Sequence, residues 1–139
     1  MITISKATKK ETKEFDKTAW NKANIEHYGK PVQWKEVKFH FKAKNEEKII
    51  ATASGKFESG VTFINTLIVN ESARKEGVGK MMIEKIAEWT KKLGGHKLWL
   101  FTGKNWQANK FYIKLGFKKM TDFPNHYFNQ DFVIYSKSL

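Results

Sequence analysis

The stretch LIVNESARKEGVGK, residues 67–80, carries the most specific structural signal in this chain. Apolar residues typical of a strand lead into a turn with two glycines, and the turn opens an amphipathic helix. Such a turn can bind an anion, because glycines let the backbone approach a phosphate while free N–H groups and the helix dipole favour negative charge. Arg74, Lys75 and Lys80 add positive charge. The pattern therefore predicts an anion site, with a bare turn as the alternative.

Two nucleotide-binding motifs are excluded at this turn. The Walker motif requires Gly-x-x-x-x-Gly-Lys followed by Ser or Thr, which residues 67–80 do not contain. A dinucleotide fingerprint needs a third glycine, and its strand belongs to a parallel sheet. Here the third glycine is missing, and the strand before Gly77 follows other strands through short turns.

Hydrophobic periodicity predicts an α+β chain on both sides of the turn. Before it we expect a short strand (residues 2–4), a helix (9–27) and three strands that short turns make antiparallel (32–44, 49–57 and 61–69). After it we expect a helix (77–93), a strand (97–102), a helix (105–115) and two last strands (117–120 and 132–136). A length of 139 residues is typical of one domain, which we place at residues 1–139.

A second motif, NWQANKFYIKLGF, occupies residues 105–117. Its apolar residues share one face of a helix, and Gly116 ends that helix. Arg-x-x-Gly-x-Gly at residues 74–79, followed here by Asn-x-x-Ala-x-x-x-Tyr-x-x-x-Gly-Phe, resembles the GNAT superfamily of acetyl-CoA-dependent N-acetyltransferases. The order of the elements is similar as well, so the resemblance covers nearly the whole chain.

The resemblance implies a mostly antiparallel mixed sheet flanked by helices, whose fourth and fifth strands splay apart into a V-shaped opening. It implies acetyl-CoA as co-substrate and transfer of the acetyl group to a primary amine of a small molecule or a protein. The implied cofactor-binding residues are Leu67, Ile68 and Val69 for the pantetheine, Arg74, Lys75, Glu76, Gly77, Val78, Gly79 and Lys80 for the pyrophosphate, and Asn105 for the pantetheine arm.

Tyr112 matches the family's tyrosine beside the thioester sulfur. A free amine that attacks the thioester forms an oxyanion, which a strand N–H can stabilise. A tyrosine stays protonated at neutral pH and can donate its proton to the departing thiolate. Tyr112 is thus the implied general acid, and a core aromatic side chain is the alternative.

The general base is left open by the sequence. Some GNAT enzymes place a glutamate on the fourth or the fifth strand, whereas residues 62–66 and 98–102 contain no carboxylate. This departure weighs against the peptide-acetylating branches that use such a glutamate. The remaining candidates are Glu71, His40, His126 and a relayed water.

Composition limits the remaining possibilities. The chain has no cysteine, which excludes disulfides, cysteine-based zinc sites and a cysteine acyl-enzyme. The four histidines lack metal-site spacing, so no metal is expected. No segment has the length of a membrane span and the N-terminus lacks a signal-peptide pattern, so we expect a cytoplasmic protein without a membrane partner.

The charge balance leaves the partners open. A net charge of +12 favours anionic partners, although Arg74 as the only arginine argues against dedicated base readout in nucleic acid. A homodimer is compatible with the sequence. The alternative function is a non-catalytic module that binds CoA, nucleic acid or an acidic protein.

Overall fold

The computed structural model describes all residues, 1–139, and the chain divides into two compact units, Met1–Trp34 and Lys35–Leu139. The single domain predicted for residues 1–139 stays a prediction. The first unit contains one helix, α1 (Lys9–Tyr28). The second contains β1 (Glu36–Asn45), β2 (Lys48–Glu58), β3 (Val61–Val69), a 3-10 turn η1 (Glu71–Ala73), α2 (Val78–Lys92), β4 (Lys97–Gly103), α3 (Ala108–Lys114), β5 (Lys118–Phe123), η2 (Tyr127–Asn129) and β6 (Phe132–Ser138).

Helix α1 confirms the predicted helix 9–27 and owes its ends to local capping. The Glu11 N–H donates to the Thr8 hydroxyl oxygen at 3.2 Å, and the Thr8 N–H donates back to the Glu11 carboxylate at 2.7 Å. Gly29 ends the helix with φ 74°, a conformation that glycine adopts without steric cost. Phe15 and Trp20 stay 75% and 62% exposed.

The strand predicted at residues 2–4 is wrong. Ile2 and Ile4 lie in irregular backbone and are almost fully exposed. Alternation of apolar and polar residues marks a strand only where another strand accepts its hydrogen bonds, and this unit contains no second strand. The chain therefore has six strands, and the predicted splay between strands four and five falls between β3 and β4.

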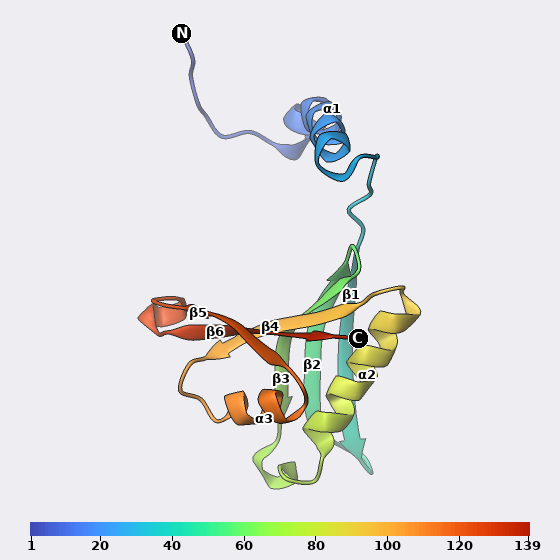
Figure 1. Cartoon of the computed structure of the whole chain (residues 1–139), viewed down its shortest axis with the longest axis vertical. Coiled ribbons are helices and arrows are strands. Elements are labelled where there is room, and N and C mark those ends of the chain that lie inside the picture. Colours follow the sequence, from blue (N-terminus) through green and yellow to red (C-terminus); the bar gives the residue numbers. More distant parts are fainter. The chain divides into compact units, whose positions relative to one another are not determined.

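The six strands form one mixed sheet in the order β1-β2-β3-β4-β6-β5. All neighbours are antiparallel except β3 and β4, which are parallel and pair only over Val61–Phe63 and Lys97–Trp99. Beyond these three pairs the strands separate, and Figure 1 shows β1–β3 running lengthwise while β4, β6 and β5 run across them. A β-bulge at Asn65, which has no partner in the register between β3 and β2, bends β3 and adds to this separation. The splayed, mostly antiparallel mixed sheet is confirmed.

One face of this sheet is covered by helices and holds the core. Alternate residues of β1 and β2 point to α2, where Trp89 lies 5.1 Å from the ring of Phe39 and 6.2 Å from Phe41. The Thr62 and Thr90 hydroxyls, both fully buried, hydrogen bond at 2.6 Å between β3 and α2. Farther along the sheet, the cluster continues through Ile86, Leu98, Leu100, Tyr112, Phe117, Val133 and Tyr135.

Three predicted boundaries needed correction in the second half of the chain. α3 begins at Ala108 rather than at Asn105, because residues 104–107 form a turn after β4. β5 and β6 extend to Phe123 and Ser138, past the predicted ends at residues 120 and 136, because pairing with each other satisfies their backbone groups. No helix of the chain combines the length and the apolar character needed to cross a membrane.

Candidate active site

A cleft of about 660 Å³ opens beside the split between β3 and β4. Its walls come from the end of β3, the glycine turn, the start of α2 and one face of α3. The lining residues are Leu67, Ile68, Val69, Ala73, Arg74, Lys75, Gly77, Val78, Gly79, Lys80, Gln107, Ala108, Phe111, Tyr112, Lys114 and Leu115. The structure thus brings the two sequence motifs together into a single hollow.

The last residues of β3 form one wall of the cleft through an open backbone edge. Leu67, Ile68 and Val69 pair with Ala53, Thr52 and Ala51 of β2, which leaves the opposite edge facing the split. β4 does not pair with β3 beyond Phe63. The N–H and C=O groups of β3 that point to this edge therefore have no hydrogen-bond partner on a neighbouring strand. An extended, amide-bearing ligand can bond there as a neighbouring strand would.

The glycine turn presents free backbone N–H groups at the start of α2. The first bond within the helix runs from the Met81 N–H to the Gly77 carbonyl at 3.0 Å, so the amides of Val78, Gly79 and Lys80 have no acceptor in the helix. Gly77 has φ 79° and nothing lies within 4 Å of where its Cβ would be, so the backbone conformation alone requires a glycine. The Arg74 Nε donates to the Val69 carbonyl at 3.2 Å, which fastens the turn to β3.

Gly79 is required for a different reason. A Cβ on this residue would come within 2.8–2.9 Å of the Phe111 ring on α3. The missing side chain therefore lets the start of α2 approach α3, and this approach narrows the cleft between the two motifs.

Tyr112 combines a buried ring with an accessible hydroxyl. The side chain is only 8% exposed and packs edge-on against Phe111 and Phe117, at 5.0 Å and 5.4 Å between ring centroids. The Tyr112 hydroxyl bonds to no protein group and no fully buried side-chain oxygen lacks a hydrogen bond, so the hydroxyl keeps some accessible surface on a residue that lines the cleft. Burial raises the pKa of Tyr112 to about 12, which keeps the phenol protonated across the physiological range. The protonated Tyr112 hydroxyl can therefore donate a hydrogen bond to a ligand in the cleft.

Two of the predicted cofactor residues do not line the cleft. Asn105 is exposed in the turn before α3, and Gln107 and Ala108 provide the wall there instead. Glu76 borders a separate, smaller hollow together with Asn45 and Ser72. The other predicted residues, from Leu67 to Lys80 and Tyr112, all lie on the walls.

Several lining residues were not predicted. Phe111 and Leu115 were recognisable only as part of the apolar face of a helix, a pattern equally typical of core packing, and Ala108 as part of the second motif. Gln107, Lys114 and Ala73 carried no sequence signal.

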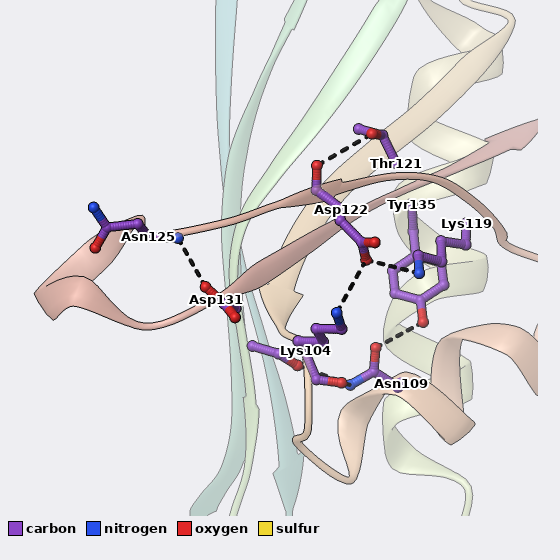
Figure 2. Close-up of polar contacts among 9 residues, drawn as sticks. Lys104, Asn109, Lys119, Thr121, Asp122, Asn125, Asp131 and Tyr135 are labelled. Carbon is purple, nitrogen blue, oxygen red and sulfur yellow. Dashed lines mark hydrogen bonds and ion pairs between the residues drawn. The ribbon is translucent and has the colours of Figure 1, made fainter.

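Asn109 holds the turn that leads from β4 into α3. Its amide nitrogen donates to the carbonyls of Gly103 at 2.8 Å and Trp106 at 2.7 Å, while its oxygen accepts from the buried Tyr135 hydroxyl at 2.7 Å. Figure 2 shows Tyr135 of β6 reaching Asn109 on α3. The side chain thereby fixes α3, and with it Tyr112, relative to β4 and β6. Nothing in its sequence context pointed to this contact.

The face of the sheet opposite the helices carries an aromatic cluster at the split. At the point where β3 and β4 separate, the centroid of the Phe63 ring lies 4.5 Å from that of Trp99 and 5.6 Å from that of Phe101. His126, in the loop before β6, lies 5.4 Å from Phe101. Of the other predicted bases, His40 is exposed on β1 and Glu71 is exposed in η1, outside the cleft.

Comparison with known proteins connects this geometry to one family. Residues 6–117 match the model of the acetyltransferase (GNAT) family. The chain belongs to the GNAT family of acetyltransferases. It is thus an acyltransferase, and the GNAT fold predicted from its two motifs is confirmed. A search of curated proteins gives no match.

Solved structures agree with the family assignment. An acetyltransferase from Bacillus cereus is similar over 99% of this chain and 98% of its own, with 25% identity and a TM-score of 0.75. A GNAT family acetyltransferase from Elizabethkingia anophelis with acetyl-CoA bound is 19% identical, over 72% of this chain and 75% of its own, with a TM-score of 0.66.

Proposed function

We propose that this GNAT protein transfers an acetyl group from acetyl-CoA directly to a primary amine of a small molecule or a protein. One observation carries the proposal. The open edge of β3, the free amides at the start of α2 and the hydroxyl of Tyr112 line one continuous cleft beside the splayed strands.

The cleft suits acetyl-CoA in both shape and chemistry. Its volume of about 660 Å³ is within the range of cofactor pockets. We assign the backbone of Leu67–Val69 to the amides of the pantetheine, which would bond as an added strand. The amides of residues 78–80, with Arg74, Lys75 and Lys80, are assigned to the pyrophosphate, because free N–H groups and positive charge both favour an anion.

Tyr112 is assigned the role of general acid. Its hydroxyl opens on the cleft, and its raised pKa ensures that the proton is present when a thiolate begins to form. The hydrogen bond from the phenol strengthens as charge develops on the sulfur, and the proton passes to the sulfur as the C–S bond breaks. A backbone N–H of β3 at the split would stabilise the oxyanion. Because the chain has no cysteine, the amine attacks the thioester within a ternary complex.

Calorimetry and initial-rate kinetics test this proposal. We expect CoA to bind and pantetheine to bind more weakly, because pantetheine lacks the pyrophosphate that the turn would hold. With acetyl-CoA and an amine that is acetylated, reciprocal plots should intersect, as a ternary complex requires. Parallel plots, or an isolated acetyl-enzyme that passes its acetyl group to the amine, would overturn direct transfer. CoA binding without acetylation of any amine would favour the non-catalytic alternative.

A further inference from the structure

We infer that His126 is the general base that accepts the proton of the acceptor amine, an inference that rests on the acetyl transfer proposed above. It places the acceptor on the face of the sheet opposite the acetyl-CoA cleft, with the reaction in the split between β3 and β4.

The first argument is position. Phe101 lies two residues beyond Trp99, the last β4 residue paired with β3, and so stands on the splayed part of the strand. Leu100 of the same strand belongs to the core under the helices, so the adjacent Phe101 points to the other face. His126 lies 5.4 Å from Phe101, while Tyr112 packs in the core on the helix side. A donor for the sulfur and an acceptor for the amine proton thus stand on opposite faces of one opening.

The second argument is that the imidazole is held in place by its surroundings. Its ring lies 4.2 Å from Phe123 and 4.2 Å from Tyr127, between centroids. The backbone of the loop is pinned as well, since the His126 N–H donates to the Gln130 carbonyl at 2.8 Å. The Lys104 N–H at the end of β4 donates to the Asp131 carbonyl at 2.9 Å. A base fixed by packing is pre-organised for proton transfer.

The third argument is that the ring nitrogens are available. His126 makes no side-chain hydrogen bond with protein, and no buried side-chain nitrogen in the chain lacks a partner. The nitrogens therefore reach the surface of the aromatic cluster, where an acceptor can approach. Neutral imidazole provides one nitrogen that can accept a proton.

The two carboxylates that lie nearest to His126 in the sequence, Asp122 and Asp131, are engaged by other groups. Asp122 on β5 lies 2.7 Å from the Lys119 ammonium and 3.8 Å from that of Lys104, and these two lysines hold the pKa of the carboxyl below its ordinary value. The Asp131 carboxylate accepts the Asn125 N–H at 2.9 Å. Figure 2 shows both carboxylates facing these partners. Both carboxylates are thus bonded to other groups, whereas the His126 side chain makes no hydrogen bond with the protein.

The proton balance is simple. The amine nitrogen forms a bond to the acetyl carbonyl carbon and gives one N–H proton to the His126 imidazole. The C–S bond then breaks, and the departing sulfur takes the Tyr112 proton. The imidazolium releases its proton to water and the phenolate regains one from water, so the products are the amide and free CoA.

Four variants of the full chain test the inference by thiol release from acetyl-CoA. The acceptor is whichever of tyramine, spermidine and a lysine peptide the parent acetylates fastest. His126→Gln and His126→Phe should each lower kcat/KM for the amine by about 10²-fold, the lower end of what a positioned base contributes. His126→Ala should fall as far and be partly restored by added imidazole. His40→Gln, an exposed histidine of β1, should match the parent. CoA affinity by calorimetry should be the same in all five proteins.

The outcomes separate a base from a packing residue. His126→Phe keeps an aromatic ring among Phe101 and Phe123, so parental turnover in that variant would overturn the inference. Failure of imidazole to raise the rate of His126→Ala would overturn it too. A parent protein that binds CoA but acetylates none of the three amines would instead contradict the proposed function, and this result is seen before any variant is made.

Discussion

The proposed cofactor side and the proposed acceptor side of this site are built in contrasting ways. The cofactor side comes from two continuous stretches, residues 67–80 and 107–115, and includes the open backbone edge of β3 and the free amides at the start of α2. The acceptor side is assembled from β3, β4, the end of β5 and the loop before β6, and it consists of side chains brought together by the sheet. Backbone chemistry at a turn depends on local residues, whereas a side-chain cluster depends on strand order and register. The contrast explains why one side can be recognised from sequence patterns and the other cannot.

The largest expected effect lies where the two sides meet. Tyr112→Phe retains the buried ring and removes the hydroxyl that opens on the cleft. Turnover should fall on the order of 10²–10⁴-fold, while CoA affinity and stability stay nearly constant. Because the pKa of Tyr112 is raised to about 12, the phenol is protonated at every pH well below 12. The ratio of parent to variant rates should therefore be constant between pH 6 and 10. Parental turnover would make Tyr112 a packing residue only.

The cofactor side can be tested with two glycines at the two ends of α2. Gly77 and Gly94 have φ 79° and 81°, and neither has an atom within 4 Å of its Cβ position. Valine at either position should cost roughly 1–3 kcal/mol of stability, because a branched side chain disfavours this conformation. Only Gly77→Val should weaken CoA, by about 10–100-fold, since one or more amides to a charged phosphate would be misplaced. Equal CoA affinities in calorimetry would break the assignment of the turn to the pyrophosphate.

The link between the two sides is the bond from Tyr135 to Asn109. Asn109→Ala should cost roughly 1–3 kcal/mol, because it leaves the hydroxyl of the buried Tyr135 without its acceptor. Tyr135→Phe should cost less, about 0.5–1.5 kcal/mol, since no donor is then left unpaired. Urea unfolding of both variants and of the double variant measures the coupling. Additive losses would show that the 2.7 Å contact does not join α3 to β6 energetically.

The smallest effect belongs to the exposed Asp122 on β5, the strand that leads into the His126 loop. Its pKa is lowered, chiefly by the hydrogen bond from Lys119, below the ordinary value of 3.8. The resulting stabilisation is present above pH 3.8 and is lost as the pH falls through the lower pKa of the folded protein. Asp122→Asn should therefore be slightly less stable than the parent at pH 7, and the difference should shrink as the pH falls below 3.8. Asp16→Asn, on exposed α1, should show no such pH-dependent difference.

The sequence determined the parts of this protein that depend on local chemistry. Hydrophobic periodicity predicted α1, and the two glycines at residues 77–79 predicted the turn that opens α2, because both signals act within a few residues of themselves. The same approach failed for Ile2 and Ile4, since an alternating pattern has no meaning without a strand beside it. It also began α3 three residues early, at Asn105.

The tertiary structure alone decided which groups face the reaction. The sequence left Glu71, His40, His126 and a relayed water open as bases, and only the structure shows that His126 lies 5.4 Å from Phe101 on the splayed part of β4. It likewise decided that the Tyr112 hydroxyl reaches the cleft and that Asn109 anchors α3 to Tyr135. One of these relations, the hydrogen bond between Asn109 and Tyr135, joins residues 26 positions apart. These relations depend on strand order, register and splay, which no local pattern in the sequence encodes.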